Sequence, residues 1–175
     1  MLDNEKLVAW VKDQNLDDLD EADLQRQLDE WKGKCEGEGL NLARLETEYW
    51  YYIINPDLWA DGEGILGKFL VFSSFVPNWW EKRFERLIMD GKVACVKWPY
   101  RKNEGRSKVM CIYANVREGH VEGDIKALAA EIVDQNLHMG KNLRFKTEEQ
   151  TNAGVYGKDF RSKFNLFDLV GPKEG

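Results

Sequence analysis

The chain has 175 residues and a formal net charge of −6, which suits a single domain with or without an appendage. Hydrophobic residues (43%) are sufficient for a core, whereas 32% charged and 12% aromatic residues exclude a membrane-embedded and a disordered protein. The start of the chain lacks the basic and apolar regions of a signal peptide. Three cysteines without a CxxC pair, Cys35, Cys95 and Cys111, predict reduced thiols and a cytoplasmic location.

Charge is distributed unevenly along the chain. Residues 1–48 hold 14 acidic and 6 basic side chains, whereas the other 127 residues hold 17 acidic and 19 basic ones. The acidic segment is typical of a solvated helical face, and a partner-docking or nucleic-acid-mimicking arm is the alternative.

Apolar spacing predicts two helices in this acidic segment, one that begins near Asp3 and Asn4 and one over about 21–34. Gly37 and Gly39 are expected to end the second helix. The segment 1–48 is therefore predicted to be a helical appendage that packs on the main domain through Trp10 and Trp31.

The rest of the chain alternates strand and helix patterns. Strands are expected over 49–54, 68–72, 93–96, 108–114 and 143–146, with helices that begin at Asn78 and over 121–137. Asn78 and Glu81 have the spacing of a capping box. From Lys68 onward the order β-α-β-β-α-β predicts an α+β fold, a split βαβ antiparallel sheet backed by helices, over a domain of residues 49–170 and a tail of 171–175.

Metal and cofactor motifs are missing from the sequence. Its two histidines, His120 and His138, lack ligand spacing and are expected at the surface near helix ends, so no metal or cofactor is predicted. Glycines 62, 64 and 67 precede a strand rather than a helix, which favours a turn over a phosphate loop.

The stretch from Lys97 to Lys108 combines five basic residues and one acid with two aromatic rings, Trp98 and Tyr100. Basic groups neutralise phosphates and aromatic faces stack on bases, so this stretch is a candidate nucleic-acid site. A charged hairpin that prevents edge pairing is the structural alternative.

Several short motifs resemble, in order and spacing, the basophilic-leukaemia-expressed protein family, whose members often carry the label of a phosphothreonine lyase domain. These motifs lie over about 50–157 and comprise Asn55-Pro56-Asp57-Leu58-Trp59, Gly67-Lys68-Phe69-Leu70-Val71-Phe72, Gly91-Lys92…Lys97, Val109-Met110-Cys111-Ile112-Tyr113, and Phe145-Lys146-Thr147…Thr151-Asn152-Ala153-Gly154-Val155-Tyr156.

The resemblance implies a fold similar to the messenger-RNA cap-binding initiation factor, with a curved antiparallel sheet backed by helices. It also implies a phosphate grip by Lys68, Lys97 and Lys146, which Arg101 and Arg161 could join. With the aromatic residues of the basic stretch and of the family motif, the predicted ligand-binding set is Lys68, Lys97, Trp98, Tyr100, Arg101, Tyr113, Lys146 and Arg161.

The leading hypothesis is non-catalytic binding of a nucleotide or another phosphorylated small molecule, or of an RNA end. A phosphothreonine lyase-like enzyme with Lys97 as base is an alternative, which the sequence disfavours because the family's acid histidine has no counterpart before the strand at Lys68. A protein-interaction module that uses the acidic N-terminal helices is the third hypothesis.

Overall fold

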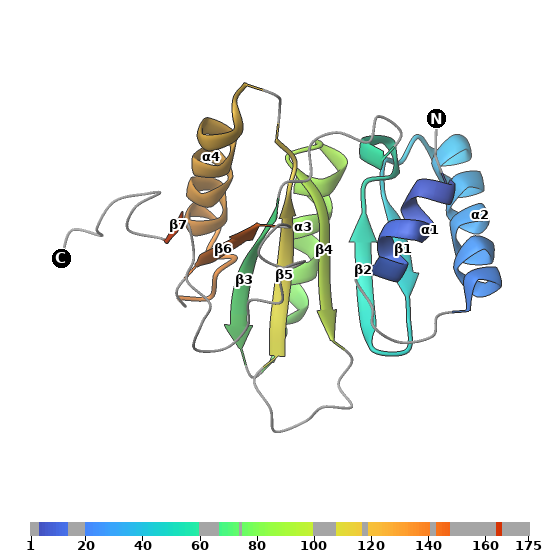
Figure 1. Ribbon diagram of the computed structural model, residues 1–175, viewed down its shortest axis with the longest axis horizontal. Coiled ribbons are helices and arrows are strands. Elements are labelled where there is room, and N and C mark those ends of the chain that lie inside the picture. The colour runs from blue at the N-terminus through green and yellow to red at the C-terminus, as the bar shows by residue number, and fades with distance from the viewer. Residues whose placement is uncertain are drawn as a thin grey trace.

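The computed structural model describes residues 4–13, 20–59, 67–73, 75–99, 108–116, 119–140, 143–147 and 164–165. Within these ranges the chain forms one open, seven-stranded antiparallel sheet and four α-helices (Figure 1). Helices α3 and α4 contribute to the core on one face of the sheet, and α1 and α2 pack on the opposite face. The structure is therefore α+β, as the sequence predicts.

The N-terminal part contains α1 (Asn4–Asp13), α2 (Glu21–Glu38), β1 (Ala43–Glu46), β2 (Trp50–Ile54) and a short 3-10 helix, Pro56–Trp59. The central part contains β3 (Gly67–Ser73), α3 (Asn78–Met89), β4 (Val93–Pro99), β5 (Lys108–Ala114) and α4 (Val121–Asp134). Strands β6 (Arg144–Thr147) and β7 (Phe164–Asn165) follow.

The strand order is β1-β2-β4-β5-β3-β6-β7. Its central segment, β4-β5-β3-β6, is the arrangement that a split βαβ pattern produces, so this prediction is confirmed. Strand β2 extends one edge of that segment, as expected. Two short edge strands, β1 and β7, were not predicted, because four and two residues carry too little alternation to be recognised.

The main core lies between the sheet and helices α3 and α4. The predicted stripe of α3 is buried and consists of Trp80, Phe84, Leu87 and Ile88. The Trp80 indole Nε1 also donates a hydrogen bond of 2.8 Å to the carbonyl of Leu137, just beyond α4. That bond satisfies the polar atom of a fully buried ring and joins the two helical segments.

A second core lies on the other face, under α1 and α2. It packs four fully or almost fully buried aliphatic residues of these helices, Leu7, Val11, Leu24 and Leu28, against the sheet. Strand β1 pairs with β2 and thus belongs to the sheet, although it lies before residue 49. The division of the chain at 48/49 stays a prediction.

Helix α2 also covers the outer edge of β1. The Gln27 side-chain amide donates to the Glu46 carbonyl (3.0 Å) and accepts from the Glu46 backbone N–H (2.8 Å). These two bonds replace those of a neighbouring strand, which protects this part of the edge from pairing with another chain.

Three local expectations need correction. Helix α3 already includes Asn78, so its N-cap is Pro77, which has no side-chain acceptor for a cap bond, and Glu81 pairs with Arg44 of β1. Helix α2 continues through Gly37 and ends at Gly39, whose φ of +66° suits glycine. His138 is only 3% exposed rather than at the surface. None of the helices in the described ranges is long and apolar enough to cross a membrane.

Candidate functional site

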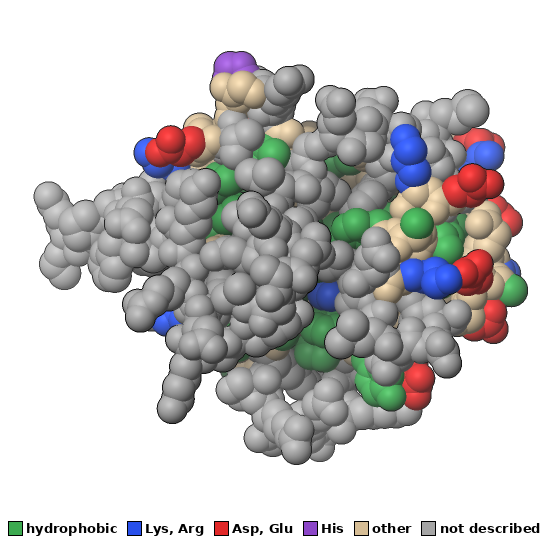
Figure 2. All heavy atoms as spheres, in the orientation of Figure 1, with side chains coloured by type: hydrophobic (Ala, Val, Ile, Leu, Met, Phe, Trp, Pro, Cys, Tyr) green, Lys and Arg blue, Asp and Glu red, His purple; other side chains and the backbone are tan. Residues whose placement is uncertain are grey.

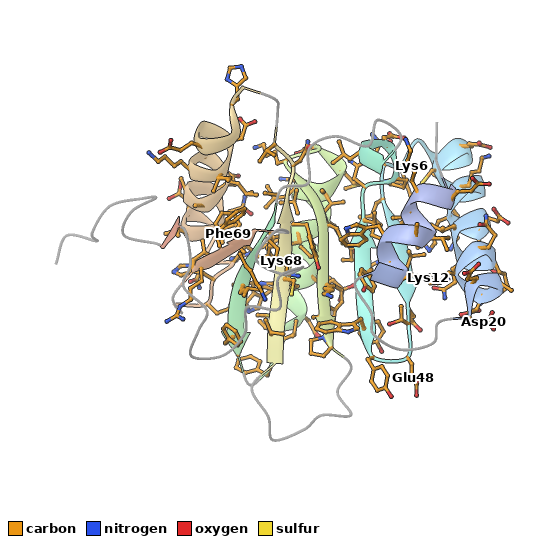
Figure 3. All side chains as sticks on the ribbon, viewed as in Figure 1. Lys6, Lys12, Asp20, Glu48, Lys68 and Phe69 are labelled. Atoms are coloured by element: carbon orange, nitrogen blue, oxygen red, sulfur yellow. The ribbon has the colours of Figure 1, made fainter. Side chains whose placement is uncertain are left out.

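Three lysines lie buried on one face of the sheet, the face on which α1 and α2 pack. Lys68 is on β3, Lys97 on β4 and Lys146 on β6, with exposed fractions of 7%, 4% and 5%. Side chains alternate along a strand, so Lys68 and its neighbour Phe69 project to opposite faces, and Phe69 enters the core under α3 and α4 (Figure 3). We call the surface with these three residues the lysine face.

The pairing register arranges the lysine face in rows that cross the strands. One row runs through Ile54, Cys95, Tyr113, Lys68 and Lys146. The next row runs through Tyr52, Lys97, Cys111, Leu70 and Arg144. Lys68 and Lys146 are thus direct cross-strand partners, whereas Lys97 lies two strands from Lys68 in the adjacent row.

Aromatic rings lie beside two of the three ammonium groups. The Lys97 Nζ lies 4.1 Å from the centroid of the Trp50 ring and 5.8 Å from that of Tyr52. The Lys68 Nζ lies 5.2 Å from the Tyr113 ring and 3.5 Å from its hydroxyl oxygen. Cation–π contacts of this kind help to hold a desolvated ammonium group. The lysine face therefore combines cations, which suit an anion, with rings, which suit a planar group.

The charges of Lys97 and Lys68 both influence the pKa of the Cys95 thiol. Burial raises the pKa of Cys95 well above its ordinary value, and the neighbouring Cys111 adds to this effect. The ammonium groups of Lys97 and Lys68 act in the opposite direction, since a nearby positive charge favours a thiolate. Desolvation is the larger effect, so Cys95 stays a protonated thiol rather than a nucleophile.

Four of the predicted ligand-binding residues, Lys68, Lys97, Tyr113 and Lys146, lie together on the lysine face. Trp98 does not join them, which corrects the prediction. It neighbours Lys97 on β4 and therefore points to the opposite face, where it is 9% exposed and stacks on Tyr51 at 5.7 Å. The other three residues, Tyr100, Arg101 and Arg161, lie outside the described residues.

Among the aromatic and charged residues of the lysine face, Trp50, Tyr52, Phe72 and Arg144 were missing from the predicted set. Arg144 is exposed and stands two residues before Lys146, so the alternation of β6 places both on one face. Trp50 and Tyr52 have the same two-residue spacing on β2. The register of β2 against β4 brings them to Lys97, and no single sequence reveals that register.

Helix α1 covers part of the lysine face. The Trp10 ring meets the Tyr113 ring edge-on at 4.9 Å and the Tyr52 ring at 6.2 Å. Because the three lysines are nearly inaccessible, a ligand reaches them only if atoms that lie over them move.

A separate hollow of about 600 Å³ lies between α2 and β1. It is lined by residues that include five acidic and two basic side chains, namely Asp20, Asp23, Glu30, Glu46, Glu48, Arg26 and Arg44. Figure 2 shows acidic side chains interspersed with Lys and Arg at this end of the molecule. Among the residues that the structure describes, no cluster of three or more His, Cys, Asp or Glu could hold a metal ion.

Comparison with known proteins gives structural matches alone. No family model matches the chain, and no curated protein matches its sequence. Two solved structures of schistosome eIF4E match, one complexed with m7GpppG and 4E-BP and the other with m7GpppA and 4E-BP. Each is 12% identical, covers 66% of this chain and 69% of its own, and has a TM-score of 0.47.

Proposed function

We propose that this protein binds a phosphate-bearing ligand, a nucleotide or an RNA end, on the lysine face. The observation that carries the proposal is the direct opposition of Lys68 and Lys146, both buried, with Lys97 in the adjacent row. Like charges directly opposite one another across two strands are destabilising. A phosphate group would relieve that repulsion and accept charge-assisted hydrogen bonds from the ammonium groups.

The aromatic rings favour a nucleotide over inorganic phosphate. Trp50 is half-buried beside Lys97, and exposed Phe72 lies farther along the same face of β3. Base–aromatic stacking contributes about 1–3 kcal/mol per base, which is comparable to a charge-assisted hydrogen bond. The resemblance to the basophilic-leukaemia-expressed family is part of this proposal, and it too rests on short motifs that contain the three lysines.

Binding without turnover is the form of the proposal that the side chains favour. Neither histidine lies on a strand of the lysine face, since His120 stands directly before α4 and His138 follows it. The lyase alternative, with Lys97 as base, would therefore need another acid. Release of inorganic phosphate from a phosphothreonine peptide, abolished in Lys97→Met, would support that alternative against ours.

A thermal-shift screen of the full chain tests the proposal. The panel contains nucleoside mono- and diphosphates, a cap analogue, 5′-phosphorylated RNA and inorganic phosphate. A ligand at 100 times its Kd stabilises the folded state by about 2.7 kcal/mol, which a raised Tm reports clearly. We expect a shift with wild type and with Lys126→Met, a control that removes an exposed lysine of α4, and a much smaller shift with Lys97→Met. Equal shifts in all three proteins would contradict the proposal.

The acidic hollow supports a second candidate function, the docking of a basic segment of another protein. Its acidic side chains outnumber its basic ones, and Trp31 contributes an aromatic surface. Substitution of Glu30 and Glu48 by Lys should abolish binding of a basic partner and leave the phosphate-ligand shift unchanged. Retained binding would exclude the hollow as the docking site.

A further inference from the structure

We infer that a base of the ligand stacks on the Phe72 ring, so that the ligand of the lysine face is a single-stranded nucleic acid longer than one nucleotide. This inference rests on the proposed function and specifies the class of ligand. It follows from the order in which the lysine face presents its charged and aromatic side chains along β3 and β6.

Phe72 lies on the lysine face at the end of β3. Lys68, Leu70 and Phe72 alternate with core residues, and their exposed fractions are 7%, 7% and 47%. One end of β3 thus has a buried charged side chain, and the other end has an exposed aromatic ring. Val109, the half-buried cross-strand partner of Phe72, provides an apolar surface beside that ring.

The distance along the strand favours a ligand longer than a mononucleotide. Phe72 is four positions after Lys68, which corresponds to about 14 Å between their Cα atoms at the rise of an antiparallel strand. A nucleoside monophosphate is shorter than this. A ligand whose phosphate lies at the Lys68–Lys146 pair therefore needs at least one further nucleotide to place a base on Phe72.

Arg144 stands between these two ends. It is the cross-strand partner of Leu70, which lies midway between Lys68 and Phe72, and its side chain is exposed. A guanidinium group forms bidentate hydrogen bonds with a phosphate. The lysine face therefore presents, in order, a buried pair of ammonium groups, an exposed guanidinium and an exposed ring. This order matches the phosphate, phosphate, base sequence of a 5′-phosphorylated oligonucleotide.

The cross-strand partner of Phe72 on β5 is the aliphatic Val109, so in this pair Phe72 is the ring on which a base can stack. Stacking on a ring is tolerant of base identity, because every base has a π-face. We therefore expect little sequence preference, in contrast to a site that reads base edges by hydrogen bonds.

Fluorescence anisotropy of the full chain with 5′-phosphorylated oligoadenylates of one, two and four nucleotides tests the inference. Phe72→Ala should weaken binding of the tetranucleotide roughly ten-fold to a hundred-fold and leave that of the mononucleotide unchanged. Phe72→Trp should retain binding, and Phe72→Leu, which keeps an apolar side chain without a ring, should behave as Phe72→Ala. Trp79→Ala, which removes a partly exposed ring from α3 in the other layer, is the matched control.

The outcomes separate the inference from the proposed function. If Lys97→Met loses binding while wild type and Phe72→Ala bind the tetranucleotide equally well, the inference is wrong and the proposed function stands. No effect of either substitution overturns both. Affinity that does not rise with length in wild type also overturns the inference. A deoxyribose tetranucleotide should bind as tightly as the ribose form, since the inferred contacts are to phosphates and bases and not to the 2′-hydroxyl group.

Discussion

Lys68 and Lys146 face each other directly across β3 and β6, and each is more than nine-tenths buried. A cross-strand pair of like charges opposes the stability of a sheet by up to about 1 kcal/mol. The sheet nevertheless places both ammonium groups, together with that of Lys97, on one face. Like charges gathered on one face in this way are typical of sites that serve a ligand.

Replacement of Lys68 by Met should therefore not destabilise the ligand-free protein. The described contacts of its Nζ are a long 3.5 Å approach to the Tyr113 hydroxyl and the ring of the same residue. We expect the free energy of unfolding to stay unchanged or to rise by about 0.5–1 kcal/mol, since the repulsion from Lys146 is removed. Urea unfolding, with Lys126→Met as control, measures the change. A loss above about 1 kcal/mol would show that Lys68 is a structural residue.

Substitution of Trp98 should affect stability and leave binding unchanged. Its ring lies in the main core, edge-on to Trp80 at 5.8 Å and stacked on Tyr51. Trp98→Ala should lower the free energy of unfolding by about 3–5 kcal/mol, because it leaves a large cavity. The folded variant Trp98→Phe should bind the phosphate ligand with wild-type affinity in the anisotropy assay. If Trp98→Phe binds the ligand more weakly without a loss of stability, Trp98 is part of the ligand site.

Stability at alkaline pH should report the buried thiol of Cys95. Burial raises its folded-state pKa above the ordinary value of 9.0, so the unfolded chain loses this proton at a lower pH than the folded protein does. The contribution of the protonated Cys95 thiol to the free energy of unfolding is therefore complete below pH 9.0. It is lost as the pH rises from 9.0 toward the folded-state pKa.

The difference in unfolding free energy between wild type and Cys95→Ala isolates this effect, since other titrating groups are common to both proteins. The difference should fall above pH 9.0, with a limiting slope of about 1.4 kcal/mol per pH unit. Urea unfolding between pH 8 and pH 10.5 measures it. A difference that does not vary with pH would contradict a raised pKa.

Periodicity predicted the long elements well. The stripe from Trp80 to Ile88 identified α3, and dense β-branched and aromatic residues identified β2, β3 and β5. The β-α-β-β-α-β order then determined the strand order, since split βαβ units have one common arrangement. The capping signals expected at helix ends were less informative about where the helices begin. Helix α3 begins at Asn78 rather than after it, so Asn78 and Glu81 do not form a capping box, and Glu81 forms an ion pair with Arg44, 37 residues earlier.

The lysine face could be predicted in part. Lys68, Lys97 and Lys146 were identified through short motifs, and their common face follows once the strands are in register. Trp98 was misplaced because β4 runs on to Pro99, so that its alternation sends Trp98 into the core. The contact of Trp50 with Lys97 joins residues that are 47 positions apart along the chain and depends on the pairing of β2 with β4, and single-sequence patterns contain no information about such pairings.

The most direct test of a phosphate grip is the preference for a 5′-phosphate over a 5′-hydroxyl group. Isothermal titration with a tetranucleotide that carries either end compares wild type with the double variant Lys68→Met, Lys146→Met. We predict that wild type binds the phosphorylated form at least ten-fold more tightly, as charge-assisted hydrogen bonds of about 1.5–3 kcal/mol imply, and that the double variant loses this preference while it stays folded. Equal affinities of wild type for both ends, or an unchanged preference in the folded double variant, would contradict the account.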